Sequence, residues 1–214
     1  GPHYLDKSEY YTETYAVFTK ADSLGKLTKL GKDVLRRITL LAQDAKDRDG
    51  ELTERGAQQS RTLVKQMMDR FPDMFTPKGY YSVRSIVENR CIMTMQEGLL
   101  QLSSSLRPIV ARSKASLQER RFMDPVDNEL TSQRLDSLTS ITYERFTDLN
   151  TNDNRLMSSL FNDMNYVMTN IDAFKLSKQL FILAGNVQHS SYAGVFSLFD
   201  IFTPEEIHSH WRKQ

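Results

Sequence analysis

Apolar residues recur every three or four positions through much of the chain, which is the spacing of one face of an α-helix. Four stripes show this most clearly: Leu30, Val34, Ile38, Leu41 and Ala45; Leu63, Met67 and Phe71; Cys91, Met95, Leu99 and Leu102; and Leu156, Leu160, Met164 and Val167. We expect these stripes to be core rather than a cofactor site, and the chain to be predominantly α-helical. In its second half the pattern predicts helices over residues 137–149, 152–168 and 171–183.

The best strand candidate covers residues 79–84, between the second and third stripes. It is short, aromatic and β-branched, and a Pro-Lys-Gly sequence leads into it. A strand between helices is typical of an α/β unit. One strand makes no sheet, so its neighbours are missing, contributed by a partner or hidden elsewhere in the pattern. The charged stretch 106–133 is interpreted as a surface connection between two lobes.

A short motif, G-x-L-T-x-x-G, occurs twice, at residues 25–31 and 50–56. Its threonines, Thr28 and Thr53, are typical residues to cap the start of a helix. A third helix start is predicted at Thr203-Pro204, where a glutamate follows at Glu206. Two copies of a short motif do not make a solenoid, which needs more repeats.

The composition is that of an ordinary globular protein, with 39% hydrophobic and 26% charged residues in 214. The 28 basic and 27 acidic residues leave a net charge of +1, which argues against a nucleic-acid-binding protein but leaves room for a local anion pocket. No apolar run is long enough to cross a membrane. A single cysteine, Cys91, makes no internal disulfide, and we expect a buried thiol. The oligomeric state stays open.

Candidate chemistry begins at Arg84, at the end of the predicted strand. Ser85 and Glu88 have the spacing of a capping box, so a helix is predicted to begin at Ser85. Ligand crevices of α/β folds lie where strands end and helices begin, and free N–H groups together with a guanidinium favour phosphate there. From spacing alone, however, we favour a surface pairing of Arg84 with Glu88 or another carboxylate. Arg90 lies on the helix itself, where salt bridges to neighbours are expected.

The four histidines are His3, His189, His208 and His210, and none has the spacing of a catalytic triad or a metal site. His208 and His210 point to different faces of a helix, and a solvated helix end explains them best. His189 lies in a polar turn without an obvious partner. The sequence therefore predicts no metal and no cofactor.

Three segments, taken in order, resemble the histidine acid phosphatases of clade 2 of the histidine phosphatase superfamily, which include phytases and multiple inositol-polyphosphate phosphatases. Residues 25–75, with the doubled motif, resemble the segment after that family's active-site loop. Residues 80–95 look like its second arginine motif, and residues 198–206 are similar to the end of its helical cap. The resemblance covers most of the chain except residues 106–133.

The resemblance implies an α/β parent fold. Residues 1–105 would be part of a phosphoglycerate-mutase-like α/β core with associated helices, and residues 106–214 a helical cap domain. It also implies hydrolysis of a phosphorylated small molecule through a phosphohistidine, with arginines neutralising the phosphoryl group. Arg84 matches the family's phosphate-binding arginine, which reverses the preference for a surface role. By family analogy the protein is expected to be periplasmic or secreted.

The chain departs from the family at both ends. Aligned on spacing, Gly1 is the glycine of R-H-G-x-R, so the attacking histidine falls before Gly1 and His3 takes the place of the loop's second arginine. The late histidine–acid pair falls beyond Gln214. We therefore expect Arg84 and His3 to bind phosphate, no catalytic residue among the 214 and no activity of this chain alone.

Two accounts of these departures stay open. A longer phosphatase has been trimmed, with Gly1-Pro2 compatible with a cleavage scar, or the chain is a degenerate relative that never had the loop. The alternative function is a non-catalytic phosphate-binding or protein-interaction relative, and a plain helical scaffold is the third possibility.

Overall fold

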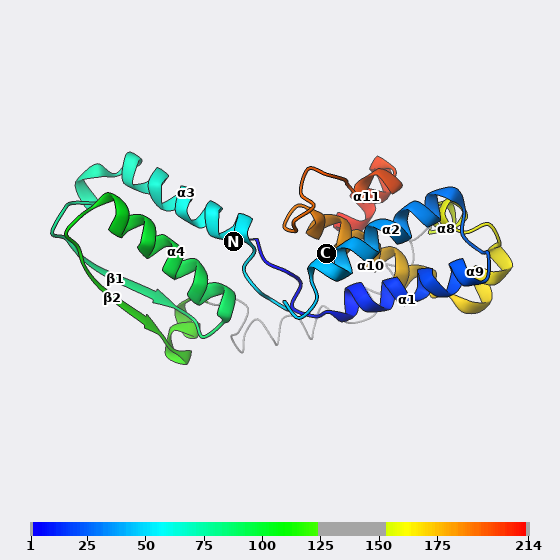
Figure 1. Ribbon diagram of the computed structural model, residues 1–214, viewed down its shortest axis with the longest axis horizontal. Helices are drawn as coiled ribbons and strands as arrows, with labels where there is room; N and C mark the ends of the chain where they lie inside the picture. Colours follow the sequence, from blue (N-terminus) through cyan, green and yellow to red (C-terminus); the bar gives the residue numbers. More distant parts are fainter. Residues whose placement is uncertain (1, 124–152, 213–214) are drawn as a thin grey trace. The chain divides into compact units, whose positions relative to one another are not determined.

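The computed structural model describes residues 2–123 and 153–212 (Figure 1). The chain forms two compact units: unit 1 comprises residues 1–3 and 50–139, and unit 2 comprises residues 4–49 and 140–214. This division differs from the expected one at 1–105 and 106–214, because residues 4–49 pack with the second half of the chain.

The named elements of unit 2 are all helices or helical turns. Its elements are α1 (Glu9–Ser23), α2 (Lys29–Asp44), α8 (Asn154–Leu160), α9 (Met164–Asn170), α10 (Ala173–Val187), the 3-10 turn η3 (Phe199–Ile201) and α11 (Pro204–Arg212). None of the described helices of either unit has the length and apolar character that crossing a lipid bilayer requires.

The core of unit 2 confirms two of the predicted stripes. Val34, Ile38 and Leu41 of α2 are buried against residues of α8, α10 and α1, among them Leu160. Burial of such side chains is worth about 1.5–3 kcal/mol each, so this cluster is the main source of stability in unit 2. Phe18 of α1 completes the cluster.

The helix predicted over residues 152–168 is interrupted, and that prediction was wrong in its extent. Phe161 leaves the helical path and forms an antiparallel bridge with Leu27. Asp163 then starts α9 by accepting a hydrogen bond from the Tyr166 N–H at 3.0 Å. Tertiary pairing to Leu27 therefore ends α8 where the apolar pattern alone would continue.

Unit 1 contains α3 (Glu54–Arg70), the 3-10 turn η1 (Pro72–Met74), β1 (Tyr80–Ser85), α4 (Asn89–Ser105), β2 (Val110–Ala115), the 3-10 turn η2 (Leu117–Glu119) and α5 (Arg120–Met123). β1 pairs with β2 in parallel, in register from Tyr80 with Val110 to Ser85 with Ala115. Because α4 connects the two strands, they form a β-α-β unit, which confirms an α/β arrangement at this coarse level.

Residues 106–133 were expected to be an irregular connection, and this was wrong for residues 110–115, which form β2. All six residues of β2 are exposed, and their sequence, Val-Ala-Arg-Ser-Lys-Ala, carries no alternation of apolar and polar side chains. The strand exists because β1 supplies its backbone partners. The rest of that stretch from residue 124 onward, and the helix expected over 137–149, lie outside the described residues.

The helix predicted to begin at Ser85 begins at Asn89 instead. Ser85 is the last residue of β1, and its hydroxyl donates to the Ile86 carbonyl at 2.8 Å rather than capping a helix. The predicted capping box at Ser85 is therefore wrong, because sheet pairing with Ala115 keeps this residue extended.

The other predicted helix starts are confirmed. Thr28 accepts a hydrogen bond from the Gly31 N–H at 3.0 Å, and Thr53 accepts one from the Gly56 N–H at 3.1 Å. Thr203 and Glu206 form a reciprocal box, because each side chain accepts the other's backbone N–H, at 3.2 and 2.9 Å. Each arrangement satisfies N–H groups that the first turn of a helix leaves unpaired.

Candidate functional site

Unit 1 brings strand ends and helix starts together at one end of the unit. β1 and β2 are parallel, so their carboxyl ends lie together, and α4 begins directly after the connection 86–88. α3 runs alongside α4 in the same direction, as the ion pair of Arg61 with Glu97 and the contact of Val64 with Gly98 show. Both helices therefore begin at the end where both strands finish (Figure 1).

His3 lies at this same end. Its backbone forms an antiparallel bridge with Leu52, just before α3 begins. The preceding carbonyl, of Pro2, accepts a hydrogen bond from the Thr53 N–H at 3.1 Å. The His3 side chain is half-buried. The fold therefore brings one of the two predicted phosphate-binding residues to the start of α3.

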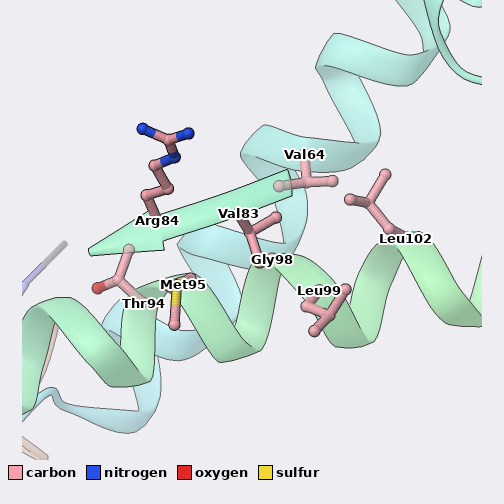
Figure 2. A pocket seen from close by; sticks show the side chains of 8 residues that line it. All are labelled: Val64, Val83, Arg84, Thr94, Met95, Gly98, Leu99 and Leu102. Carbon is pink, nitrogen blue, oxygen red and sulfur yellow. The ribbon is translucent and has the colours of Figure 1, made fainter. Parts of the chain in front are cut away.

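Arg84, the other predicted phosphate-binding residue, lies one position before the end of β1. Its side chain leaves the strand on the face opposite to Val83, which points toward α4 (Figure 2). The side chain is 59% exposed, and Nη1 lies 3.6 Å from Oε2 of Glu119. The expectation from spacing alone, a pairing of Arg84 with Glu88 or another carboxylate, is therefore confirmed, and the carboxylate is that of Glu119.

Glu119 holds a second cation beside Arg84. Lys114 is the register partner of Arg84 on β2, and its Nζ lies 3.3 Å from Oε1 of Glu119. The Glu119 side chain is only 7% exposed, so its carboxylate is shielded from water. The side chains of Arg84 and Lys114 are both exposed to water. Among the described residues, two positive groups thus share one negative group. Sequence reasoning missed Lys114, because β2 was not predicted.

Arg90 lies in the first turn of α4, at the strand end. Its Nη1 is 3.7 Å from Oε2 of Glu88, which confirms the expected salt bridge to a neighbour. A cation in the first turn of a helix opposes the helix dipole, and a bound anion would relieve this repulsion. Arg90 thus places a guanidinium at the start of α4, in a position where phosphate is favoured.

A cavity of about 260 Å³ lies between α3, α4 and β1 (Figure 2). Its lining comprises Val64, Val83, Arg84, Thr94, Met95, Gly98, Leu99 and Leu102. The Thr94 hydroxyl is engaged by the Arg90 carbonyl, at 2.7 Å, and the Arg84 guanidinium points away from the other lining side chains. This cavity therefore suits an apolar group and is not the phosphate site.

Leu63 and Met67 lie on one face of α3 and Phe71 follows its last residue, but this stripe is not buried as core. These side chains are 58%, 43% and 46% exposed. No apolar side chains of the described residues cover these three side chains. The helix prediction was right for Leu63 and Met67, and the core prediction was wrong for all three residues.

Two histidines of unit 2 differ from expectation. His210, expected at a solvated helix end, is 7% exposed, stacks on Phe181 with ring centroids 4.9 Å apart, and has Nε2 2.8 Å from the Ser177 hydroxyl. That prediction was wrong because α11 packs on α10. Ser177 is fully buried, so this serine–histidine pair gives a substrate no access. His189 has a partner after all, since its Nδ1 lies 3.4 Å from Nδ2 of Asn186.

Within residues 2–123 and 153–212, no three His, Cys, Asp or Glu side chains converge as a metal ion would require. Cys91 is a free thiol, half-buried rather than fully buried as predicted. No protein-family model matches the chain, and no curated protein shows a significant sequence match to it. Its function is therefore argued from the site itself and from the motifs.

Proposed function

We propose that this chain is part of a histidine acid phosphatase of the phytase or multiple inositol-polyphosphate phosphatase kind, and that unit 1 binds the phosphoryl group of a phosphorylated small molecule. Unit 1 would be part of the phosphoglycerate-mutase-like core, and unit 2 would contribute the helical cap. A periplasmic or secreted location belongs to the same proposal. One observation carries it: His3, Arg84 and Arg90 lie toward the end of unit 1 where parallel strands finish and helices begin.

The chemistry of these residues suits a phosphate group. A guanidinium donates two parallel hydrogen bonds to phosphate oxygens, and the Arg84 side chain is exposed enough to reorient, with Lys114 left beside the buried Glu119 carboxylate. Its ion pair with Glu119 at 3.6 Å is long for a hydrogen bond, so a dianion competes with it readily. Lys114, beside Arg84 on the sheet, is a third cation after Arg84 and Arg90. We expect it to contribute to phosphate binding through its charge alone.

Binding without turnover is expected of these 214 residues. In the family's mechanism a histidine attacks phosphorus and an acid protonates the leaving alcohol, and the resemblance puts both outside Gly1–Gln214. What remains is the fixed positive charge that stabilises a transferring phosphoryl group.

The test is a calorimetric titration of the 214-residue chain with inorganic phosphate and with phytate, at low salt. A charge-assisted hydrogen bond is worth about 1.5–3 kcal/mol, so Arg84→Ala and Arg90→Ala should each weaken binding about 10- to 100-fold. Arg112→Ala is the matched control, because Arg112 is an exposed arginine on β2 and its loss changes the net charge equally. No binding by the wild type, or equal affinities of all three variants, would refute the proposal.

A hydrolysis assay completes the test. The chain should not turn over p-nitrophenyl phosphate or phytate. Turnover that disappears in Arg84→Ala would show that a nucleophile lies within the chain, and the account of the missing histidine would be wrong.

A protein-interaction role is the second candidate, and the exposed stripe of Leu63, Met67 and Phe71 favours it. Contiguous exposed apolar surface marks interaction sites in many soluble proteins. If this face joins two copies of the chain, sedimentation should show concentration-dependent association that Met67→Lys abolishes. A monomer at all concentrations, with phosphate binding intact, would exclude this role in favour of the first.

A further inference from the structure

The second copy of the G-x-L-T-x-x-G motif binds a backbone carbonyl from the start of the chain. Both the N–H and the hydroxyl of Thr53 donate to the Pro2 carbonyl oxygen, at 3.1 and 3.2 Å. A Cβ added at Gly56 would lie 2.2 Å from the same oxygen. Only glycine leaves room for this carbonyl, so the motif's last residue is needed for the contact as well as for the helix start.

The first copy makes the same contact with a different segment. The N–H of Thr28 donates to the Leu160 carbonyl at 3.0 Å, while the Thr28 hydroxyl lies 2.6 Å from the Ser159 carbonyl oxygen and 3.2 Å from that of Leu160. A Cβ added at Gly31 would lie 2.1 Å from that oxygen. The flanking residues pair alike too, since the residue before each threonine forms an antiparallel bridge with the residue after each carbonyl. The motif is therefore a carbonyl dock that the chain uses twice.

The two docks hold different side chains. The first holds Leu160 and Phe161, which are 0% and 1% exposed, so its role is to complete the core of unit 2. The second holds Pro2 and His3, which are only half-buried and add no apolar side chain to a core. What the second dock fixes is the position of an imidazole at the strand end of unit 1.

We infer that Thr53 and Gly56 are positioning residues that fix His3 for phosphate binding, by docking the Pro2 carbonyl on the start of α3. The inference rests on the proposed function in so far as His3 contacts phosphate. The N–H and the hydroxyl of Thr53 fix the position of the Pro2 carbonyl. The bridge with Leu52 fixes the direction in which the side chains of residues 2 and 3 point. Holding the backbone in place before the ligand arrives removes an ordering cost from binding.

The experiment compares Gly56→Ala with Gly31→Ala, which introduce the same methyl group against the same kind of carbonyl. The probes are the imidazole resonances of His3 in nuclear magnetic resonance spectra, identified through His3→Gln, and the affinity for inorganic phosphate. In the wild type, phosphate should shift the His3 resonances. Gly56→Ala should move these resonances without ligand and weaken phosphate binding at least tenfold, whereas Gly31→Ala should leave both unchanged and lower only thermal stability.

Two variants of Thr53 test the same inference if the Gly56→Ala protein does not fold. Thr53→Val keeps the backbone donor and loses the hydroxyl, so it should move the His3 resonances, and Thr53→Ser should restore them. His3 resonances that are identical in wild type, Gly56→Ala and Thr53→Val would overturn the inference. If the wild-type protein binds no phosphate, the proposed function is refuted. A change of the His3 resonances in the Gly56 and Thr53 variants alone would still show that these residues position His3.

Discussion

The Glu206 side chain joins the start of α11 to α8, and replacing it by glutamine removes a charge with little change of shape. Its carboxylate accepts hydrogen bonds from Arg155 Nε at 2.7 Å, from Arg155 Nη2 at 2.5 Å and from the Thr203 N–H at 2.9 Å. A partly exposed ion pair contributes up to about 1 kcal/mol. The negative charge at a helix start adds about 0.3–1 kcal/mol. We therefore expect Glu206→Gln to lower the free energy of unfolding by about 1–2 kcal/mol at pH 7.

The loss should depend on pH in a definite direction. Burial raises the pKa of Glu206, but the hydrogen bonds from Arg155 and the Thr203 N–H lower it by more, so the pKa lies below its ordinary value of 4.5. A carboxyl group with a lowered pKa contributes stability that is complete above about pH 4.5 and is lost as the pH falls through the pKa of the folded state. Since glutamine does not titrate, wild type and variant should converge in acid.

Urea unfolding followed by the fluorescence of Trp211 measures this effect locally. Trp211 is the only tryptophan and lies on α11 itself. The neighbouring exposed residue gives the matched control, Glu205→Gln, with the same change of charge. A difference between wild type and Glu206→Gln that is as large at pH 3 as at pH 7, or an equal loss in the control, would refute the reasoning.

Three further substitutions test the packing of unit 2 and unit 1. Ser177→Ala should cost about 1–3 kcal/mol by the same fluorescence assay, because the buried His210 ring loses the hydroxyl 2.8 Å from its Nε2; unchanged stability would show that this contact is not a stabilising hydrogen bond. Leu160→Ala should cost about 2–5 kcal/mol in thermal unfolding followed by circular dichroism, because the side chain is fully buried. Leu63→Ala should change stability by less than about 0.5 kcal/mol, since Leu63 is largely exposed. Equal losses in the two leucine variants would contradict the distinction between core and surface stripes.

Short-range patterns predicted several elements because neighbouring residues decide them. The face of α2, with Val34, Ile38 and Leu41, follows from helical spacing, and its burial was confirmed. The caps at Thr28 and Thr53 follow from the ability of a side-chain oxygen to accept an N–H three residues ahead. These interactions need no distant partner, and the sequence alone is sufficient to predict them.

Long-range pairing decided what the patterns missed. β2 is exposed, has no alternation of apolar and polar residues, and becomes a strand only beside β1. Ser85 has the spacing of a helix start but stays extended because it pairs with Ala115. His210 reads as a surface residue, and packing of α11 on α10 buries it.

For the candidate site, the sequence determined the kinds of residue and the resemblance that singled out Arg84 and His3. Only the tertiary structure decided that Arg84 shares Glu119 with Lys114, and that the Pro2 carbonyl lies against Gly56. The physical reason is that both contacts join segments far apart in the chain. The type and spacing of side chains can be read from the sequence. Their distant partners depend on the strand register and on which remote backbone carbonyl packs against a helix start.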